Sequence, residues 1–247
     1  MHFTVEEARK ELNWTPLHLA TAKGDLEEII KQLDHIFVFV DARDDEQRTP
    51  LHLASHAGNP EVVALLLEKK AEVDARNSKN WTPLHLACTM GHHEVVRILL
   101  DKSASVNARQ EDLWTPLHLA SAKGYHEVAR LLLDKSASVD AREDDQWTPL
   151  HVACAKGHHE VVRVLLDYNA SIDAKGKDDW TPLHLASSTG HHKVVRLLLD
   201  KNASINGCAG YPASDRAFCR YPRIRSELRI DPAGAPDHSL FMNLRAE

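Results

Sequence analysis

Histidine is the residue in this sequence best suited to acid–base or metal chemistry, and it recurs at regular intervals. Six of the 17 histidines close a Thr-Pro-Leu-His segment, namely His18, His52, His85, His118, His151 and His184. Three Gly-His-His segments place further pairs at 92–93, 158–159 and 191–192. Adjacent residues of a helix point in different directions, and a zinc site needs His or Cys four residues apart or paired cysteines. The sequence therefore predicts no metal site and no cofactor.

Nucleophilic catalysis has no better support. Cys88 and Cys154 fall at a small, buried position of a predicted helix, where a thiol packs rather than reacts. Cys208 and Cys219 could form a disulfide if oxidised, although nothing in the sequence requires it. The chain contains no phosphate-binding loop and no Gly-x-Ser-x-Gly segment. Its histidine motifs are repeated, which is unlike a single active site, so we predict that the protein is not an enzyme.

All the tryptophans occupy one position, directly before a Thr-Pro pair, and this row is the strongest candidate for binding. Its members are Trp14, Trp81, Trp114, Trp147 and Trp180, and Arg48 takes the same position before Thr49. Trp and Arg are the residues most enriched at the hot spots of protein interfaces. Alternatively, each ring packs against the next segment and stiffens the protein. Both interpretations can hold, because a tryptophan can bury one face and expose the other.

The elements that carry these residues repeat with a nearly fixed period. The Thr-Pro-Leu-His-like segments begin at Thr15, Thr49, Thr82, Thr115, Thr148 and Thr181, with a spacing of 34 residues once and 33 thereafter. In each unit Thr suits a helix N-cap, Pro suits the first turn and a later Gly ends the helix. A second, apolar helix follows. A first helix of about two turns is too short to be stable alone, so the units must stack on one another.

These segments resemble the ankyrin repeat over residues 13–206, in about six units. The resemblance is carried by Thr-Pro-Leu-His-x-Ala, the mid-unit glycine, the Glu-Val-Val-Arg-like second helix and the Ala-x-Val-Asn/Asp-Ala exit. It implies an all-α fold, a solenoid of stacked helix pairs with β-hairpin fingers, in which the Thr-Pro-Leu-His histidines bond between units. It also implies that the position before Thr-Pro lies on a finger and faces a groove where partners bind.

Charged residues line the predicted groove on two sides. The fingertips are mostly acidic, and lysines recur at the ends of the first helices. Besides the tryptophan row and Arg48, the predicted protein-binding residues are Met90, Glu111, Asp112, Lys123, Asp144, Asp145, Lys156 and Asp178. The partner expected here is a protein segment with basic and apolar residues. The alternative is a solvated charged rim that keeps the protein soluble.

Two local departures from the repeat pattern carry structural predictions. The fingertip glycine of the ankyrin repeat is replaced throughout, at one place by Leu113. This position requires a positive φ, which leucine tolerates poorly, so we expect that finger to be strained or reshaped. The extra residue of the first unit lies in the segment "HIFVFV" at 35–40. There we expect Val40 and one of Phe37 or Phe39 to pack inward, with the other phenylalanine partly exposed.

Both ends of the chain differ from the repeats. Residues 1–12 predict an N-terminal capping helix, because Thr4 and Glu7 form a capping-box pattern ahead of an apolar face. Residues 207–247 lack the repeat motif and contain six arginines but no lysine. We expect them to form a flexible tail, with a docking motif as the alternative.

Composition narrows the range of partners and compartments. The net charge of −6 and the isoelectric point near 6.3 give no basic surface for nucleic acid. No apolar run is long enough to span a membrane, and the N-terminus lacks the pattern of a secretory signal. Four cysteines in this length do not indicate a disulfide scaffold. We therefore expect a monomer located in the cytoplasm or nucleus.

The function that these features favour is a non-catalytic protein-interaction module, such as an adaptor, scaffold or inhibitor. The alternative is a substrate-recognition subunit of a ubiquitin ligase, in which "FCRYPRIRSEL" at 218–228 would serve as a degenerate SOCS-box-like docking segment. That likeness is faint, since Asp215 stands where the resemblance requires leucine. The sequence does not name the partner, because a fold of this kind presents many different surfaces.

Overall fold

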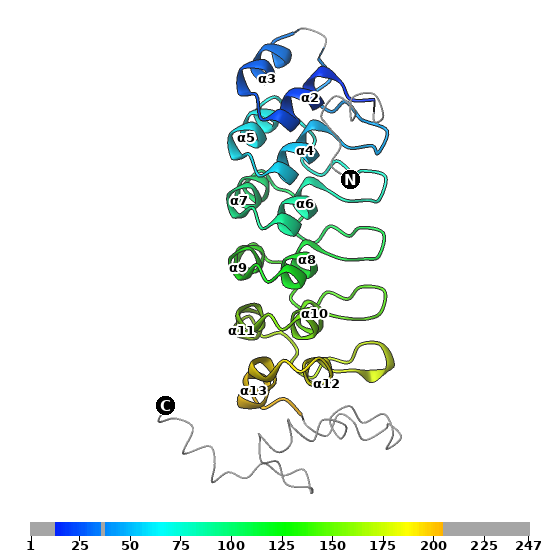
Figure 1. Cartoon of the computed structure of the whole chain (residues 1–247), viewed down its shortest axis with the longest axis vertical. Coiled ribbons are helices and arrows are strands. Elements are labelled where there is room, and N and C mark those ends of the chain that lie inside the picture. Colours follow the sequence, from blue (N-terminus) through cyan, green and yellow to red (C-terminus); the bar gives the residue numbers. More distant parts are fainter. Residues whose placement is uncertain (1–12, 36–37, 205–247) are drawn as a thin grey trace, which may run out of the picture.

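The helices form two parallel columns, and loops project from one column toward a common side (Figure 1). The computed structural model describes residues 13–35 and 38–204. The column next to the loops, here the inner column, contains α2 (Pro16–Lys23), α4 (Pro50–Ala57), α6 (Pro83–Met90), α8 (Pro116–Lys123), α10 (Pro149–Lys156) and α12 (Pro182–Ser188). The outer column contains α3 (Leu26–Leu33), α5 (Pro60–Glu68), α7 (His93–Asp101), α9 (His126–Asp134), α11 (His159–Asp167) and α13 (His192–Asp200). One inner and one outer helix make a unit, and the stack of units 1 to 6 confirms the all-α solenoid.

Each inner helix begins at a threonine whose capping is shared with a histidine. In unit 4 the Thr115 hydroxyl accepts the backbone N–H of His118, and Nδ1 of His118 accepts the backbone N–H of Thr115. This capping box satisfies two backbone donors that the start of a helix leaves open. Because Nδ1 is an acceptor, the proton of the neutral ring lies on Nε2, which is therefore free to donate to another unit.

The core runs between the two columns along the whole stack. It is built from one buried leucine of each inner helix and one of each outer helix, for example Leu117 of α8 and Leu132 of α9, except that Ile29 takes this role in α3. A buried leucine contributes roughly 1.5–3 kcal/mol relative to an exposed one. Each helix pair also packs on the pairs before and after it, so the core is continuous through the stack.

In units 2 to 5 the glycine that ends the inner helix is required for two reasons. Gly91 follows α6 with a φ of 77°, a left-handed conformation that favours glycine. The ring of Tyr125, from the next unit, also occupies the space of a side chain there, since an added Cβ would lie 2.8 Å from it. His92, His158 and His191 cover the glycines of units 2, 4 and 5 in the same way.

The loops before each Thr-Pro pair are fingers in shape, but the prediction that they are β-hairpins is wrong for the part of the chain described here, where no strand forms. We number each finger by the unit that it enters: finger 2 (43–48), finger 3 (76–81), finger 4 (109–114), finger 5 (142–147) and finger 6 (175–180). Finger 2 closes with a bond from Asp44 N–H to the Arg48 carbonyl (3.0 Å) and one from Gln47 N–H to the Asp44 carbonyl (2.8 Å). Beyond this turn the backbone of finger 2 bonds to the next finger, as when Ser78 N–H donates to the Glu46 carbonyl (2.9 Å).

The finger at Leu113 keeps the common shape and carries strain instead. Leu113 has a φ of 60°, close to the 59° of Gln47 and the 63° of Gln146. A non-glycine residue in this conformation costs about 1–2 kcal/mol. Finger 6 is the one that is reshaped, because Asp178 and Asp179 both have positive φ within a short 3₁₀ turn, Lys177–Asp179.

The extra residue of unit 1 changes how its outer helix docks. Val38 and Val40 are partly buried against the core, as predicted for Val40, whereas Phe39 is 83% exposed. Phe37 lies outside the described residues. α3 packs on α2 but makes few contacts with α5, whereas each later outer helix packs on its neighbour. The longer connection after α3 therefore accompanies a looser first unit.

Candidate protein-binding surface

The residues before the Thr-Pro pairs form one row along the finger side of the stack. All of them are half-buried: Trp14, Arg48, Trp81, Trp114, Trp147 and Trp180. Half-burial means that each side chain is held by the protein and still presents part of its surface to solvent. The two interpretations of the tryptophan row, packing and display, are therefore compatible at every position.

The row is fixed to the inner helices through the histidines. The indole rings of four units lie against the histidine of their own capping box, with centroid distances of 6.4 Å for Trp14, 5.9 Å for Trp81, 5.7 Å for Trp114 and 6.0 Å for Trp180. The backbone is held by the unit before. For example, His118 Nε2 donates to the Trp147 carbonyl (3.1 Å) and His151 Nε2 to the Trp180 carbonyl (3.0 Å). One imidazole thus caps a helix, supports an indole and bonds to the next finger.

Burial keeps these rings neutral. Desolvation lowers the pKa of His52, His85, His118 and His151 from 6.5 to about 4, against the opposing effect of the hydrogen bond to the next finger's carbonyl. Burial also lowers the pKa of His18 and His184 at the two ends. Protonation would place a second proton on Nδ1 and break the capping bond. These histidines are therefore structural groups that hold the row of side chains.

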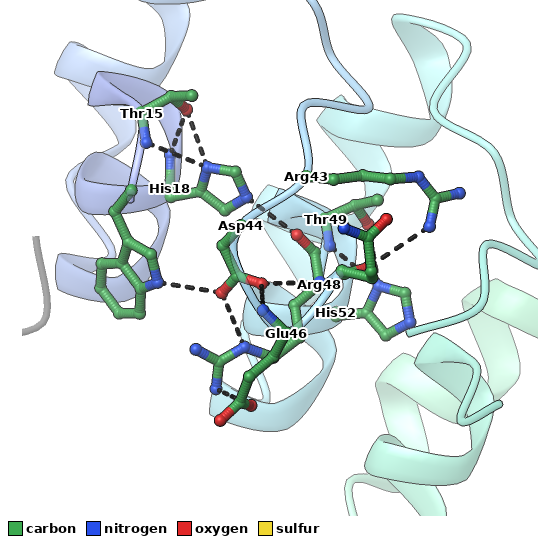
Figure 2. A network of polar contacts seen from close by, with 10 residues as sticks. Thr15, His18, Arg43, Asp44, Glu46, Arg48, Thr49 and His52 are labelled. Atoms are coloured by element: carbon green, nitrogen blue, oxygen red, sulfur yellow. Dashed lines mark hydrogen bonds and ion pairs between the residues drawn. The ribbon is translucent and has the colours of Figure 1, made fainter. Parts of the chain in front are cut away.

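Finger 2 replaces the aromatic side chain with a buried polar network (Figure 2). Asp44, with its side chain fully buried, accepts a hydrogen bond from Trp14 Nε1 (3.0 Å) and pairs with Arg48 Nε (2.8 Å). The Arg48 guanidinium also lies over the Trp14 ring at 5.9 Å and pairs with Glu46 at 3.2 Å. A cation, an indole and two carboxylates are thus assembled at one place on the row.

Between fingers 5 and 6 the tryptophan has no carboxylate to bond. Trp147 lies against Gly176, where an added Cβ would be 2.6 Å from the ring, and its Nε1 is buried with no hydrogen-bond partner in the part of the chain described. Gly176 corresponds to Asp44 in the repeat register, so the acceptor that Trp14 finds is missing here. In fingers 2 and 6 the second residue of the finger therefore decides the environment of the tryptophan in the unit before.

The predicted charged residues other than Arg48 are all exposed. Glu111 and Asp112 lie at the tip of finger 4, Asp144 and Asp145 at that of finger 5, and Asp178 at that of finger 6. Lys177 pairs with Asp145 at 2.6 Å and so neutralises part of this charge. Met90, Lys123 and Lys156 are exposed at the ends of α6, α8 and α10, the inner helices. The predicted set is thus spread along the stack rather than gathered in one pocket.

The sequence interpretation missed a second row of contacts, made by the bases that precede the fingertips. Arg43 Nη1 donates to the Arg76 carbonyl (2.7 Å), and Arg142 Nη1 donates to the Lys175 carbonyl (2.7 Å). The recurrence of a base just before each finger was the available signal. These arginines tie adjacent fingers together through the backbone.

Catalytic and metal-binding features are not evident in what the structure describes. Burial raises the pKa of the free Cys88 and Cys154 thiols, which makes them poor nucleophiles. Among residues 13–35 and 38–204, no three His, Cys, Asp or Glu side chains come together in a way that could hold a metal ion. Over the same residues, no helix combines the length and the apolar character that a bilayer span requires.

Comparison with known families agrees with this geometry. The family model for ankyrin repeats, in three copies, matches residues 2–77, 73–143 and 135–207. The chain therefore belongs to the ankyrin-repeat family, whose members generally act as protein-interaction modules. Among curated proteins, no sequence matches this one.

Proposed function

We propose that this protein is a non-catalytic adaptor, scaffold or inhibitor that binds a segment of another protein along its fingers and inner helices. The observation that carries the proposal is the row of half-exposed Trp and Arg side chains on one side of a stacked frame. Rigid aromatic anchors lose little entropy on binding, because their positions are already set. Burial of the free thiols of Cys88 and Cys154 is compatible with the reducing cytoplasm or nucleus that we propose as its location.

The test compares the wild-type protein with a Trp114→Ala/Trp147→Ala variant in quantitative affinity capture. We expect the variant to lose the partners that the wild-type protein retains. A matched control, Arg97→Ala/Arg130→Ala, changes two exposed residues of the outer helices α7 and α9 and should retain them. Thermal unfolding of each protein separates loss of binding from loss of fold. Equal capture by the wild type and the tryptophan variant would show that the row is not the recognition surface.

The ubiquitin-ligase alternative depends on residues 207–247, which lie outside the described residues. No contact of the described chain favours it, and it stays a hypothesis. A direct measurement is binding of a synthetic peptide of residues 207–247 to an elongin pair. Failure to bind would remove this role and leave the interaction module unaffected.

We also propose that residues 1–12 cover the N-terminal edge of the stack. That edge is open in the described structure: Pro16 is exposed where Pro50 and Pro83 are buried, and a pocket of about 220 Å³ lies beside it. The pocket is lined by Pro16, Leu19, Ala20, Lys23, Asp25 and Glu28. Deletion of residues 2–12 should speed amide exchange in α2 and α3 while leaving α8 and α9 protected. Unchanged exchange in α2 would argue against a cap.

A further inference from the structure

Finger 2 shows how a guanidinium is bound within the row of residues that precede the Thr-Pro pairs. The Arg48 guanidinium lies over the indole of Trp14 and pairs with the Asp44 carboxylate, which is fully buried. Asp44 is the first residue after the arginine that opens the finger, and its Oδ1 also accepts the backbone N–H of Arg48 at 2.8 Å. The arrangement shows that an indole and a buried carboxylate in this register bind a guanidinium.

Finger 5 repeats this carboxylate but not the cation. Glu143 occupies the place of Asp44, is only 7% exposed, and its Oε1 accepts the backbone N–H of Trp147 at 2.9 Å. The residue corresponding to Arg48 is Trp147, which carries no charge. Within the described residues Glu143 forms no ion pair, and the nearby Lys177 pairs with Asp145 instead. A nearly buried carboxylate is costly unless a cation or several hydrogen bonds compensate it.

The other fingers do not share this combination. The residues corresponding to Glu143 are Asn77 in finger 3, Gln110 in finger 4 and Gly176 in finger 6, and none of them is charged. Finger 5 also has the largest excess of acidic residues, with three carboxylates against Arg142, whose Nη1 is occupied by the backbone carbonyls of Gln146 and Lys175. A nearly buried carboxylate without an ion pair and adjacent indoles therefore coincide at one finger only, among those described.

We propose that finger 5 is the subsite for an arginine side chain of the bound protein segment. The guanidinium would stack on the exposed face of Trp114 or Trp147 and pair with Glu143 and the exposed Asp144. Arginine fits better than lysine, because its planar group can stack on an indole and bond a carboxylate at the same time. This inference rests on the proposed function and adds the chemistry of one anchor to it.

The test uses the full-length protein and a random peptide library displayed on phage. Peptides selected on the wild-type protein should carry an arginine at a common position. In a selected peptide, replacing that arginine with citrulline, a neutral isostere, should weaken binding about tenfold or more. Replacing it with lysine should weaken binding by a smaller factor. On the Glu143→Gln variant, which keeps the acceptor for the Trp147 N–H, the citrulline substitution should weaken binding by a clearly smaller factor, because only Asp144 remains to pair with the guanidinium.

A matched control is Glu61→Gln, which removes one exposed carboxylate from the outer helix α5 and should change the affinity less than about twofold. Peptides that need Trp114 and Trp147 but show no citrulline effect, or show the same effect on Glu143→Gln, would overturn this inference alone. The same holds if the lysine peptide binds as tightly as the arginine peptide. Failure to select any peptide that depends on the tryptophan row would overturn the proposed function together with the subsite.

Discussion

Unit 1 and the central units carry the same motif in different surroundings. Pro16 and Gly24 of unit 1 are exposed, whereas Pro116 and Gly124 of unit 4 are covered to a greater extent by their neighbours. Outer helix α3 makes few contacts with α5, whereas α9 packs on both α7 and α11. A solenoid unit is stabilised mainly by its neighbours. The comparison therefore indicates that stability increases from the N-terminal end toward the middle of the stack.

A fall in pH should cause the largest loss in the free energy of unfolding, and this loss should arise mostly in the central units. The four histidines with a pKa near 4 when folded take up protons below pH 6.5 once unfolded, so their stabilisation is complete above pH 6.5 and lost as the pH falls toward 4. Between pH 7 and pH 5 each should cost about 1–2 kcal/mol of the free energy of unfolding. Urea unfolding at both pH values measures the summed loss from the four histidines. An unchanged free energy would show that these rings are not neutral in the folded state.

A matched pair of leucines tests the comparison by mutation. Leu33 of α3 and Leu100 of α7 hold the same place in their units and are 9% and 8% exposed. Leu100→Ala should lower the free energy of global unfolding by about 3 kcal/mol. Leu33→Ala should lower it less and should instead speed amide exchange in α2 and α3, because unit 1 can open alone. Equal global losses would mean that the stack unfolds as one cooperative block.

The glycines after the inner helices separate backbone strain from inter-unit contact. Gly190→Ala meets no atom within 4 Å, so it should cost only the left-handed strain of about 1–2 kcal/mol. At Gly24 the nearest neighbour of an added Cβ is the flexible Asn59 side chain, at 3.3 Å, and a similar cost is expected. Gly91→Ala should cost about 1 kcal/mol more than Gly190→Ala, because the Tyr125 ring must move. Equal losses at all three sites, measured by thermal unfolding, would exclude a role for the ring.

The exposed ion pairs between outer helices should contribute least to the free energy of unfolding. Lys135 pairs with Asp101 of the preceding unit at 2.8 Å, and both side chains are about half exposed. Asp101→Asn should therefore lower the free energy of unfolding by less than about 1 kcal/mol, and the difference should vanish in high salt. Lys69→Gln, which removes the pair with Asp34, provides the same measurement at unit 1. A loss that persists in high salt would indicate a contribution from packing instead.

Much of the fold follows from local residue chemistry. Thr-Pro at the start and glycine at the end predict the inner helices correctly, because capping and φ preferences act within a few residues. The positive φ at Leu113 was predicted for the same reason. The fingers were not predicted correctly, because whether two arms pair as strands depends on competing bonds to the units beside them. The candidate surface was placed on the finger side, but the partners of Asp44, Glu143 and Trp147 were not foreseeable from composition.

The sequence by itself determined the number and order of the units, the residues before each Thr-Pro pair and the histidines that cap the helices, since these depend on a short repeating pattern. Only the tertiary structure decided how the repeats differ from one another. Arg48 is compensated by Asp44 within finger 2, whereas Glu143 in finger 5 forms no ion pair in the described chain. The physical reason is that the energy of a charge depends on the groups beside it. Some of these groups belong to the same finger, and others lie about 30 positions away in the sequence.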